Sequence, residues 1–377
     1  MTKRIRCAVV ALMLMPAIGT AQDFNAGLTA FDAGDYATAL QEWRTLAEQG
    51  DAAAQYNVGF MYDNGEGVLK DNAEAVLWYR MAAEQGHAMA QYTLGRRYKN
   101  GEGVLKDDAE AARWYRMAAE QGDAGSQNIL GVMYANGEGV LKDDAEAVRW
   151  YRMAAEQGNT LAQYNLGLMY ADGEGVLKDD TEAARWYRMA AEQGHAGSQN
   201  NLGVMYKNGE GVLKDNAEAV RWYRMAAKQG VARAQFSLGV MYYYGEGVLK
   251  DNAEAVRWYR MAAKQGVVEA QSNLALIYYN GEGILKNDAE AVRWYRMAAE
   301  QGDATAQFNL GVMYANGEGV LKDMSSTHMW SNIASANGYE GAAKNRERAE
   351  GEMTSEQIAE ATRRARVCMS SGYGDCD

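Results

Sequence analysis

Proline is almost missing from this chain of 377 residues, and the single one is Pro16, near the N-terminus. Without a proline-rich stretch, nothing in the composition divides the remaining sequence into linked domains. Histidine and cysteine are also scarce, with three residues of each. The sequence contains no His-Glu-x-x-His, no Gly-x-Ser-x-Gly and no Gly-x-x-x-x-Gly-Lys-Ser/Thr. We therefore expect no catalytic site, no metal and no cofactor, and a protein that is not an enzyme.

Long apolar runs are missing as well, apart from Ala8–Met15 near the N-terminus. Three basic residues precede this run, and the small residues Gly19–Ala21 follow it. The run is too short to span a bilayer comfortably, so we interpret residues 1–21 as a secretory signal peptide and not as a membrane anchor. We expect an exported protein, periplasmic or secreted, with no membrane insertion.

Positive charge is in the minority, with 38 Lys and Arg against 50 Asp and Glu. The resulting formal net charge is −12. An acidic protein repels nucleic acids and anionic lipids, which excludes both as electrostatic partners. We expect a monomer whose partner is a protein or peptide.

What the sequence has in quantity is a repeat of 36 residues. The repeat shows most clearly in eight evenly spaced tryptophans: Trp78, Trp114, Trp150, Trp186, Trp222, Trp258, Trp294 and Trp330. A unit of this length cannot close a hydrophobic core alone, so neighbouring units must stack into a solenoid.

Each unit predicts two helices separated by a glycine-marked loop. In the third unit, residues 123–158, spacings of three and four residues place one set on a single face of the first helix. That set is Gln127, Leu130, Gly131 and Tyr134. Gly137 follows, and glycine readily adopts the left-handed conformation found just past a helix end.

The second helix of the unit begins after Asp143, which we expect to cap it, with Glu146 completing a capping box. Its apolar stripe consists of Ala147, Trp150, Tyr151 and Ala154. Small residues let the helices approach closely, and the large rings fill the remaining space. Arg149 and Arg152 lie at helical spacings from Glu146 and Glu156. We interpret them as a solvated, charge-paired face and not as a basic binding stripe.

Three segments that recur in the units carry a family resemblance. In the third unit they read Leu130-Gly131-Val132-Met133-Tyr134, Gly137-Glu138-Gly139-Val140 and Trp150-Tyr151-Arg152-Met153-Ala154-Ala155. The pattern resembles the Sel1-like repeats, which are related to tetratricopeptide repeats, and it covers eight units over residues 51–338. The resemblance implies an all-α, right-handed superhelical solenoid of antiparallel helix pairs that serves as a protein–protein interaction scaffold.

The two ends depart from the repeat and predict terminal caps. Residues 22–50 form a shorter helical pair in which Trp43 aligns with the tyrosine of the unit and not with its tryptophan. Residues 339–377 add two polar helical stretches, the second capped by Thr354 or Ser355. Solenoids need terminal units with a polar outer face. A regulatory or partner-binding tail is a second interpretation of the C-terminal residues.

Two cysteines, Cys368 and Cys376, remain after removal of the signal peptide. In an exported chain such a close pair predicts a disulfide. A metal site is the alternative, but no histidine lies nearby and two thiolates rarely suffice for structural zinc.

Comparing the units with one another locates a candidate binding surface. Variation concentrates at the third, sixth, tenth and thirteenth positions of the unit, which line one stripe of the first helix. Our candidate protein-binding residues on and beside it are Tyr56, Tyr92, Arg96, Lys99, Tyr164, Phe236, Tyr243, Tyr244, Tyr279 and Phe308. The alternative is that some of these residues pack against neighbouring helices and that the others vary because the units drifted apart after duplication. His87 and His195 share a helix-start position, which we interpret as variable surface.

These observations favour an exported scaffold that binds a protein or peptide on its concave, first-helix surface. A secreted factor that engages a host protein is an alternative. The resemblance also extends to Sel1-like proteins that bind or hydrolyse β-lactams, so a β-lactam- or peptidoglycan-directed hydrolase is a further alternative. The serine enzymes of that chemistry need Ser-x-x-Lys, which this chain lacks.

Overall fold

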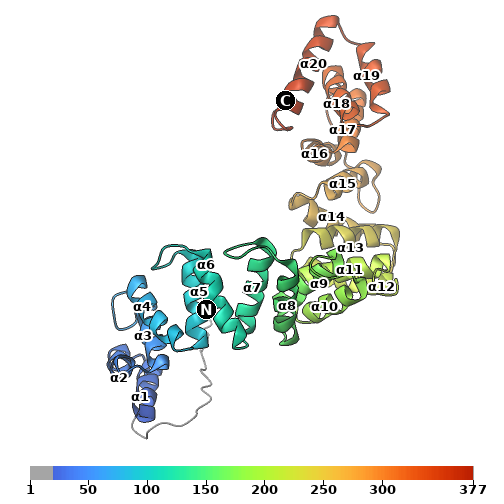
Figure 1. Ribbon diagram of the computed structural model, residues 1–377. Helices are drawn as coiled ribbons and strands as arrows, with labels where there is room; N and C mark the ends of the chain where they lie inside the picture. Colours follow the sequence, from blue (N-terminus) through green and yellow to red (C-terminus); the bar gives the residue numbers. More distant parts are fainter. Residues whose placement is uncertain (1–19, 377) are drawn as a thin grey trace. The chain divides into compact units, whose positions relative to one another are not determined.

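A computed structural model describes the backbone of residues 20–376 and the side chains of residues 24–376. This part of the chain holds twenty helices and no strand (Figure 1). The expected all-α fold of paired helices is therefore confirmed. The expected signal peptide, residues 1–21, lies outside the described residues except for its last two. Within residues 20–376, no helix is long and apolar enough to cross a membrane.

The chain forms two compact units, residues 1–178 and 179–377, which we describe separately. The helices of the first unit are α1 Thr20–Ala33, α2 Tyr36–Glu48, α3 Ala52–Asn64, α4 Asn72–Glu84, α5 Ala88–Asn100, α6 Asp108–Glu120, α7 Ala124–Asn136, α8 Asp144–Glu156 and α9 Thr160–Asp172. From α3 onward, each odd-numbered helix is the first of a repeat, which we call helix A. The even-numbered partner is helix B, and within this unit each helix from α1 to α9 packs against its neighbours in the chain.

The second unit begins with helix B of the fourth repeat and continues in the same alternation to the eighth. Its helices are α10 Asp180–Glu192, α11 Ala196–Asn208, α12 Asn216–Lys228, α13 Ala232–Tyr244, α14 Asn252–Lys264, α15 Val268–Asn280, α16 Asp288–Ala299, α17 Ala304–Asn316, α18 Met324–Ala336, α19 Ala342–Glu350 and α20 Ser355–Ser370. The last two follow the repeats, and both pack on α18.

Helix boundaries follow the capping residues that the sequence indicates, with one difference. Gly137 ends α7 with φ 72°, and the Asp143 carboxylate accepts from the backbone N–H groups of Ala145 and Glu146. The expected capping box is wrong, however, because the N–H of Asp143 donates to the carbonyl of Tyr134 at 3.0 Å. The Glu146 carboxylate instead pairs with Arg149.

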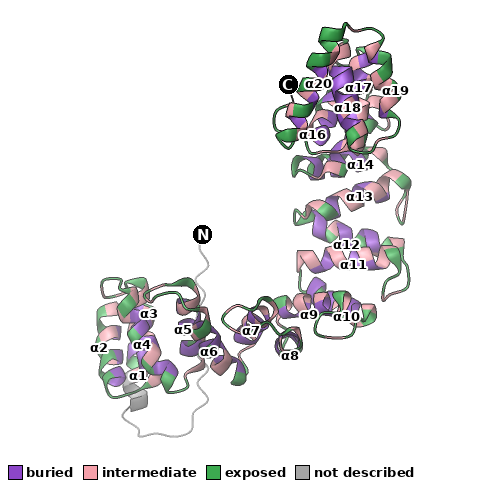
Figure 2. Ribbon diagram, turned by 45° about the horizontal axis from the view of Figure 1, so that its top comes forward, coloured by how far each residue is buried: buried purple, intermediate pink, exposed green. Residues whose placement is uncertain are grey.

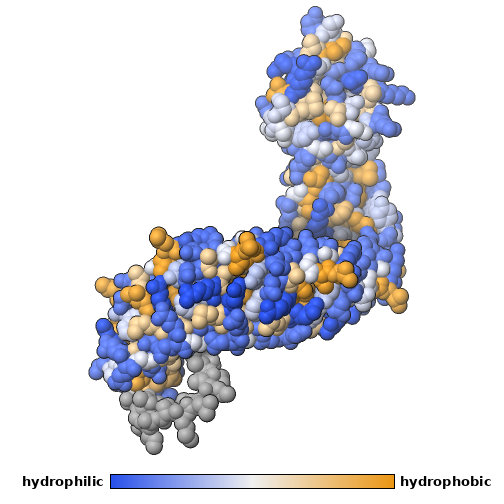
Figure 3. Space-filling model, viewed as in Figure 1, coloured by the Kyte–Doolittle hydropathy of each residue, from blue (hydrophilic) through white to orange (hydrophobic). Residues whose placement is uncertain are grey.

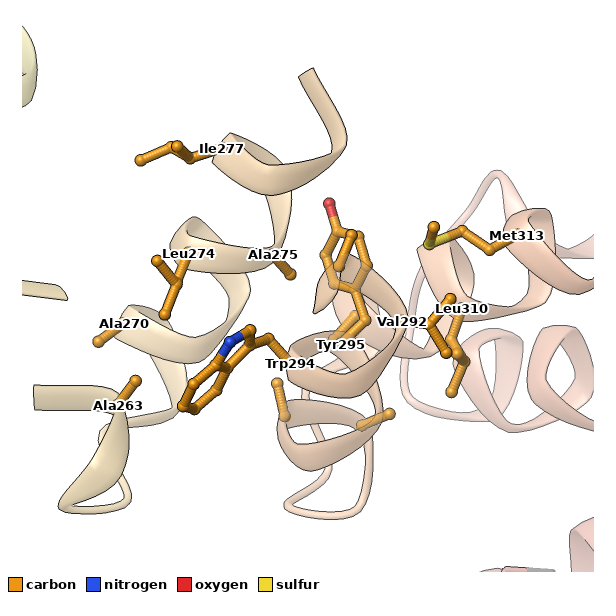
Figure 4. Close-up of a cluster of buried hydrophobic side chains, with 14 of the residues drawn as sticks. Ala263, Ala270, Leu274, Ala275, Ile277, Val292, Trp294, Tyr295, Leu310 and Met313 are labelled. Carbon is orange, nitrogen blue, oxygen red and sulfur yellow. The ribbon is translucent and has the colours of Figure 1, made fainter. Parts of the chain in front are cut away.

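The core of each unit is made by the tryptophan and tyrosine of helix B. In Figure 4, the Trp294 ring of α16 points toward Ala263 and Leu274, which belong to the preceding helices α14 and α15. The Tyr295 ring lies beside Ala275 in the same view. Both rings are almost fully buried, and buried residues occupy the interior of the helix pairs throughout (Figure 2). Trp294 thus joins its repeat to the one before it.

The tyrosine ring explains the glycine in the middle of helix A. A Cβ atom added to Gly239 would lie 2.7 Å from the ring of Tyr259, too close for any real contact. The expected role of this glycine, close approach of two helices, is confirmed. The eighth repeat carries Ser331 in place of the tyrosine. A Cβ atom at Gly311 would lie 3.1 Å from the Ser331 hydroxyl, 3.4 Å from the Thr327 carbonyl oxygen and 3.5 Å from the Asn345 amide.

The end caps are built from the same contacts. Trp43 lies against Gly27, the contact that tyrosine makes in the repeats, so its predicted alignment with the tyrosine is confirmed. At the other end, Thr354 begins α20 with a complete capping box formed with Gln357. A disulfide joins Cys368, in the last turn of α20, to Cys376, which follows the helix.

Candidate binding surface

The stripe of variable positions, which we call the helix A stripe, lies beside a fully buried face of the same helix. In α13, for example, Leu238 and Met241 are buried, whereas Arg233 is exposed and Val240 and Tyr243 are half-buried. Any surface that the stripe offers to a partner therefore consists of side chains at the third, tenth and thirteenth positions.

The sixth position contributes less than we expected, because its aromatic rings pack on helix B. Tyr56 is only 8 % exposed, with its ring 5.5 Å from that of Tyr79 and stacked on His87 at 5.0 Å. Its inclusion among the binding residues is wrong, since the ring belongs to the core.

The remaining aromatic residues of the sixth position are half-buried. Tyr92 meets Tyr115 edge to face with ring centroids 5.9 Å apart, and Phe236 meets Tyr259 at the same distance. Phe308 is stacked on Tyr339 at 4.4 Å. Tyr164 is half-buried as well. These rings are partly covered by the protein itself, so only part of each is open to a ligand.

The thirteenth position connects each repeat to the loop of the next. Tyr243 donates to the Glu282 carboxylate at 2.6 Å, and Tyr279 donates to Glu318 at 3.1 Å. In the first unit, Lys99 pairs in the same way with Glu138. We expected these side chains to be free for a partner, but each is already engaged within the protein.

The electrostatics of these contacts follow from the carboxylates. The hydrogen bond to Glu282 raises the pKa of Tyr243 to about 12, and burial with the bond to Glu318 raises the pKa of Tyr279. The ammonium of Lys250 lies 5.5 Å from the centre of the Tyr243 ring. Both tyrosines therefore remain neutral donors at physiological pH.

Tyr244 is the aromatic side chain most available to a partner. It is 66 % exposed, and its ring stands perpendicular to that of Tyr243 with centroids 4.9 Å apart. Six other repeats have asparagine at this position, as at Asn280, whose amide donates to Glu282 at 2.9 Å. The tyrosine gives up that loop contact and exposes a large ring instead.

The structure adds exposed apolar residues to the stripe that are missing from our candidates. Met89 and Leu161 occupy the third position and Leu276 the tenth, and all three are exposed. Arg96, one of our candidates, is exposed at the tenth position too. The sequence could have indicated these three residues, because each is an apolar side chain at a variable position. Our candidates include only aromatic and charged residues.

A buried glutamine network connects the repeats and has no counterpart in our sequence interpretation. The Gln235 amide of α13 donates to the carbonyl of Ala227 in the preceding repeat at 3.1 Å and accepts from Gln265 at 2.7 Å. The sequence pattern places such glutamines on the packing face without a polar role. The bonds satisfy a buried amide that would otherwise destabilise the stack.

The second arginine of helix B also makes a contact between repeats. We expected Arg152 to pair with Glu156, but its guanidinium donates to the hydroxyl of Tyr170 at 2.6 Å, in the next repeat. Arg149 does pair with Glu146, as expected, and lies 4.8 Å over the Trp150 ring. The second arginine of helix B is therefore engaged between repeats, whereas the first, Arg149, remains exposed beside its tryptophan.

The two histidines at helix starts cap their helices. The Nδ1 atom of His87 accepts from the N–H of Ala90 at 3.1 Å, and His195 accepts from Ser198 in the same way. Burial lowers the pKa of both rings. His328 is buried beside Glu350. Across residues 20–376, no three His, Cys, Asp or Glu side chains gather in a way that could hold a metal ion.

Comparison with known proteins places these features in a family. The model of the Sel1 repeat matches eight consecutive segments, residues 52–87, 88–123, 124–159, 160–195, 196–231, 232–267, 268–303 and 304–339. Each begins one residue later than the units that the sequence pattern indicates. None of the curated proteins matches the chain.

Two crystal structures are similar over most of both chains. One is a Sel1 repeat protein from Oxalobacter formigenes, 31% identical with a TM-score of 0.64. The other is a protective antigen present in uropathogenic Escherichia coli strains that displays an SLR fold, 31% identical with a TM-score of 0.57. Each alignment covers 89% of this chain and 96% of the other.

Proposed function

Because this chain belongs to the Sel1 repeat family, whose members generally serve as protein-interaction scaffolds, we propose that it binds a protein or peptide on the helix A stripe. The observation that carries the proposal is the exposed ring of Tyr244 on α13, directly beside the stripe, with Leu276 exposed in the stripe on the next helix A. An aromatic ring offers a large contact area with little conformational entropy to lose, which suits a binding hot spot.

The polar surroundings favour a protein surface or peptide over a small molecule. Tyr243 and Tyr279 hold their hydroxyls and neighbouring carboxylates in place, so the apolar groups lie on a rigid frame. Apolar anchors inside a polar, preorganised rim are typical of protein interfaces.

We test the site by capture of a partner with purified protein and with two variants. Tyr244→Asn introduces the residue that six other repeats have, and Leu276→Arg introduces the residue of the second repeat. Neither should change helical content or melting temperature, whereas both should weaken capture at least about tenfold. The matched control replaces Arg257 and Arg293 on helix B by alanine.

Loss of the partner in the arginine variant, with retention in the other two, would place the functional face on helix B. If every variant captured the partner as well as the unmodified protein does, the helix A stripe would not be the binding site.

Export is part of the proposal and rests on the N-terminal sequence. We infer that residues 1–21 are removed and that the mature chain starts at Gln22. The intact mass of the protein from cell fractions tests this directly. Recovery from the periplasm favours an envelope partner, and recovery from the medium favours the host-directed alternative.

A further inference from the structure

Each repeat exposes one leucine almost completely, in the loop between helix A and helix B. These leucines are between 89% and 91% exposed: Leu69, Leu105, Leu141, Leu177, Leu213, Leu249, Leu285 and Leu321. Figure 3 shows hydrophobic groups of this kind standing out separately from a hydrophilic surface. A fully exposed leucine is ordinary once, but one in the same loop of every repeat makes a periodic surface.

The loops that carry the leucines are stacked on one another. The second glycine of each loop lies against the first turn of helix B of the preceding repeat, as Gly139 does against Asp108 and Gly247 against Asn216. Within each compact unit the loops therefore follow one another along one edge. We call the four leucines of a unit, with these loops, the leucine ridge.

Charge beside the leucines is mixed and not basic. Lys142 follows Leu141 and pairs with Asp144 at 3.5 Å, and Lys286 follows Leu285 and pairs with Asp288 at 3.3 Å. These carboxylates neutralise the lysines that would otherwise attract an anionic membrane, and the chain as a whole is acidic.

We propose that the leucine ridge binds the leucine ridge of a second copy of this chain, in antiparallel orientation about a twofold axis. A second copy has the same spacing of leucines by construction, so every leucine of one ridge finds its counterpart on the other. Each loop has an aspartate within two residues of its lysine, so opposite charges are available on both copies of the ridge, as a twofold interface requires.

The area of the ridge is sufficient for such a dimer. Four leucines that are nine-tenths exposed offer on the order of 600 Å² of apolar surface, and lysine stems extend it toward the roughly 800 Å² per partner of stable interfaces. This proposal is independent of the helix A stripe and replaces our expectation of a monomer.

Sedimentation velocity of the purified chain, from about 1 to 100 μM, tests the proposal. We expect a concentration-dependent dimer that strengthens as salt is added, because two acidic copies repel each other at low ionic strength. Replacing the central leucines of each ridge, Leu105→Glu with Leu141→Glu and Leu249→Glu with Leu285→Glu, should raise the dimer Kd at least about 100-fold in one or both pairs.

The matched control is Leu77→Glu with Met81→Glu, which places the same change on exposed apolar residues of α4, outside both the ridge and the helix A stripe. Its Kd should equal that of the unmodified protein, and circular dichroism should show equal helicity in all variants. A chain that stays monomeric at every concentration and salt level would overturn the proposal, as would a dimer that neither ridge variant weakens. Vesicle binding lost in the ridge variants, without dimerisation, would assign the ridge to lipid instead.

Discussion

Replacing Gly239 by alanine should destabilise the protein, whereas the same replacement at Gly311 should stabilise it. Both glycines occupy the middle of helix A in the second unit, in α13 and α17. A Cβ atom at Gly239 would lie 2.7 Å from the buried Tyr259 ring. At Gly311 the nearest atom is the Ser331 hydroxyl at 3.1 Å, because the eighth repeat lacks the tyrosine.

Two opposing effects give the magnitudes. Alanine in a helix interior is favoured over glycine by about 1 kcal/mol, and this gain applies at both sites. Overpacking against a buried ring costs about 1–3 kcal/mol, which applies at Gly239. At Gly311 the gain requires the Ser331 hydroxyl, 3.1 Å from the added Cβ atom, to move by a few tenths of an ångström. We therefore expect a net loss of about 0–2 kcal/mol at Gly239 and a gain of about 0.5–1 kcal/mol at Gly311. The seventh repeat already has Ala275 beside Tyr295, which shows that the overlap can be relieved and keeps the expected loss small.

Native-state hydrogen exchange of α13 and α17 is the suitable assay, because repeat proteins open locally and a single melting temperature averages over repeats. The urea midpoint of the whole chain provides a second measurement. Equal changes in stability at the two glycines, or a gain in stability at Gly239, would show that the tyrosine ring is not what makes the two sites differ.

Three further predictions concern the caps and the repeat. His87→Asn should reduce the loss of stability that occurs as pH falls below about 6.5, because the pKa of the native ring is lowered and the unfolded chain therefore binds the extra proton. Melting temperatures at pH 5 and 8 check this, and an unchanged difference between the two temperatures would contradict it. Deleting residues 231–266 should leave a folded chain, since a repeat beginning with valine again follows Gly230; circular dichroism should remain helical, and an aggregated product would argue against regular stacking. Thiol labelling of denatured, unreduced protein should find neither Cys368 nor Cys376 free, and full labelling of both would exclude the bridge and weaken the inference of export.

The candidate site was less predictable than the fold for a specific reason. The variable stripe was visible in the sequence, but whether a stripe residue is free depends on what the next repeat places against it. Tyr243 bonds to Glu282, 39 residues away, and Arg152 bonds to Tyr170, 18 residues away. A helical wheel of one repeat contains neither partner.

The exposure of the leucine ridge could not be predicted from the sequence of one repeat either. Leu141 follows Val140 in a loop that hardly changes between repeats, and a constant leucine is usually read as part of the core. In the structure it is 90% exposed. The loop stacks on the preceding repeat, and this stacking directs Leu141 toward solvent instead of into the core.

By itself, the sequence determined the repeat, the helix pairs, the aspartate caps of helix B and the buried face of each helix. These follow from periodicity and from local hydrogen-bonding preferences, which act over a few residues. Tertiary structure alone decided that Tyr56 is core, that Tyr243 is already bonded and that Tyr244 is open to a partner. The offset between stacked repeats sets these contacts. That offset results from packing tryptophan rings against alanines of the preceding repeat, as Trp294 does against Ala263, whereas the tyrosine rings pack against glycines of their own repeat.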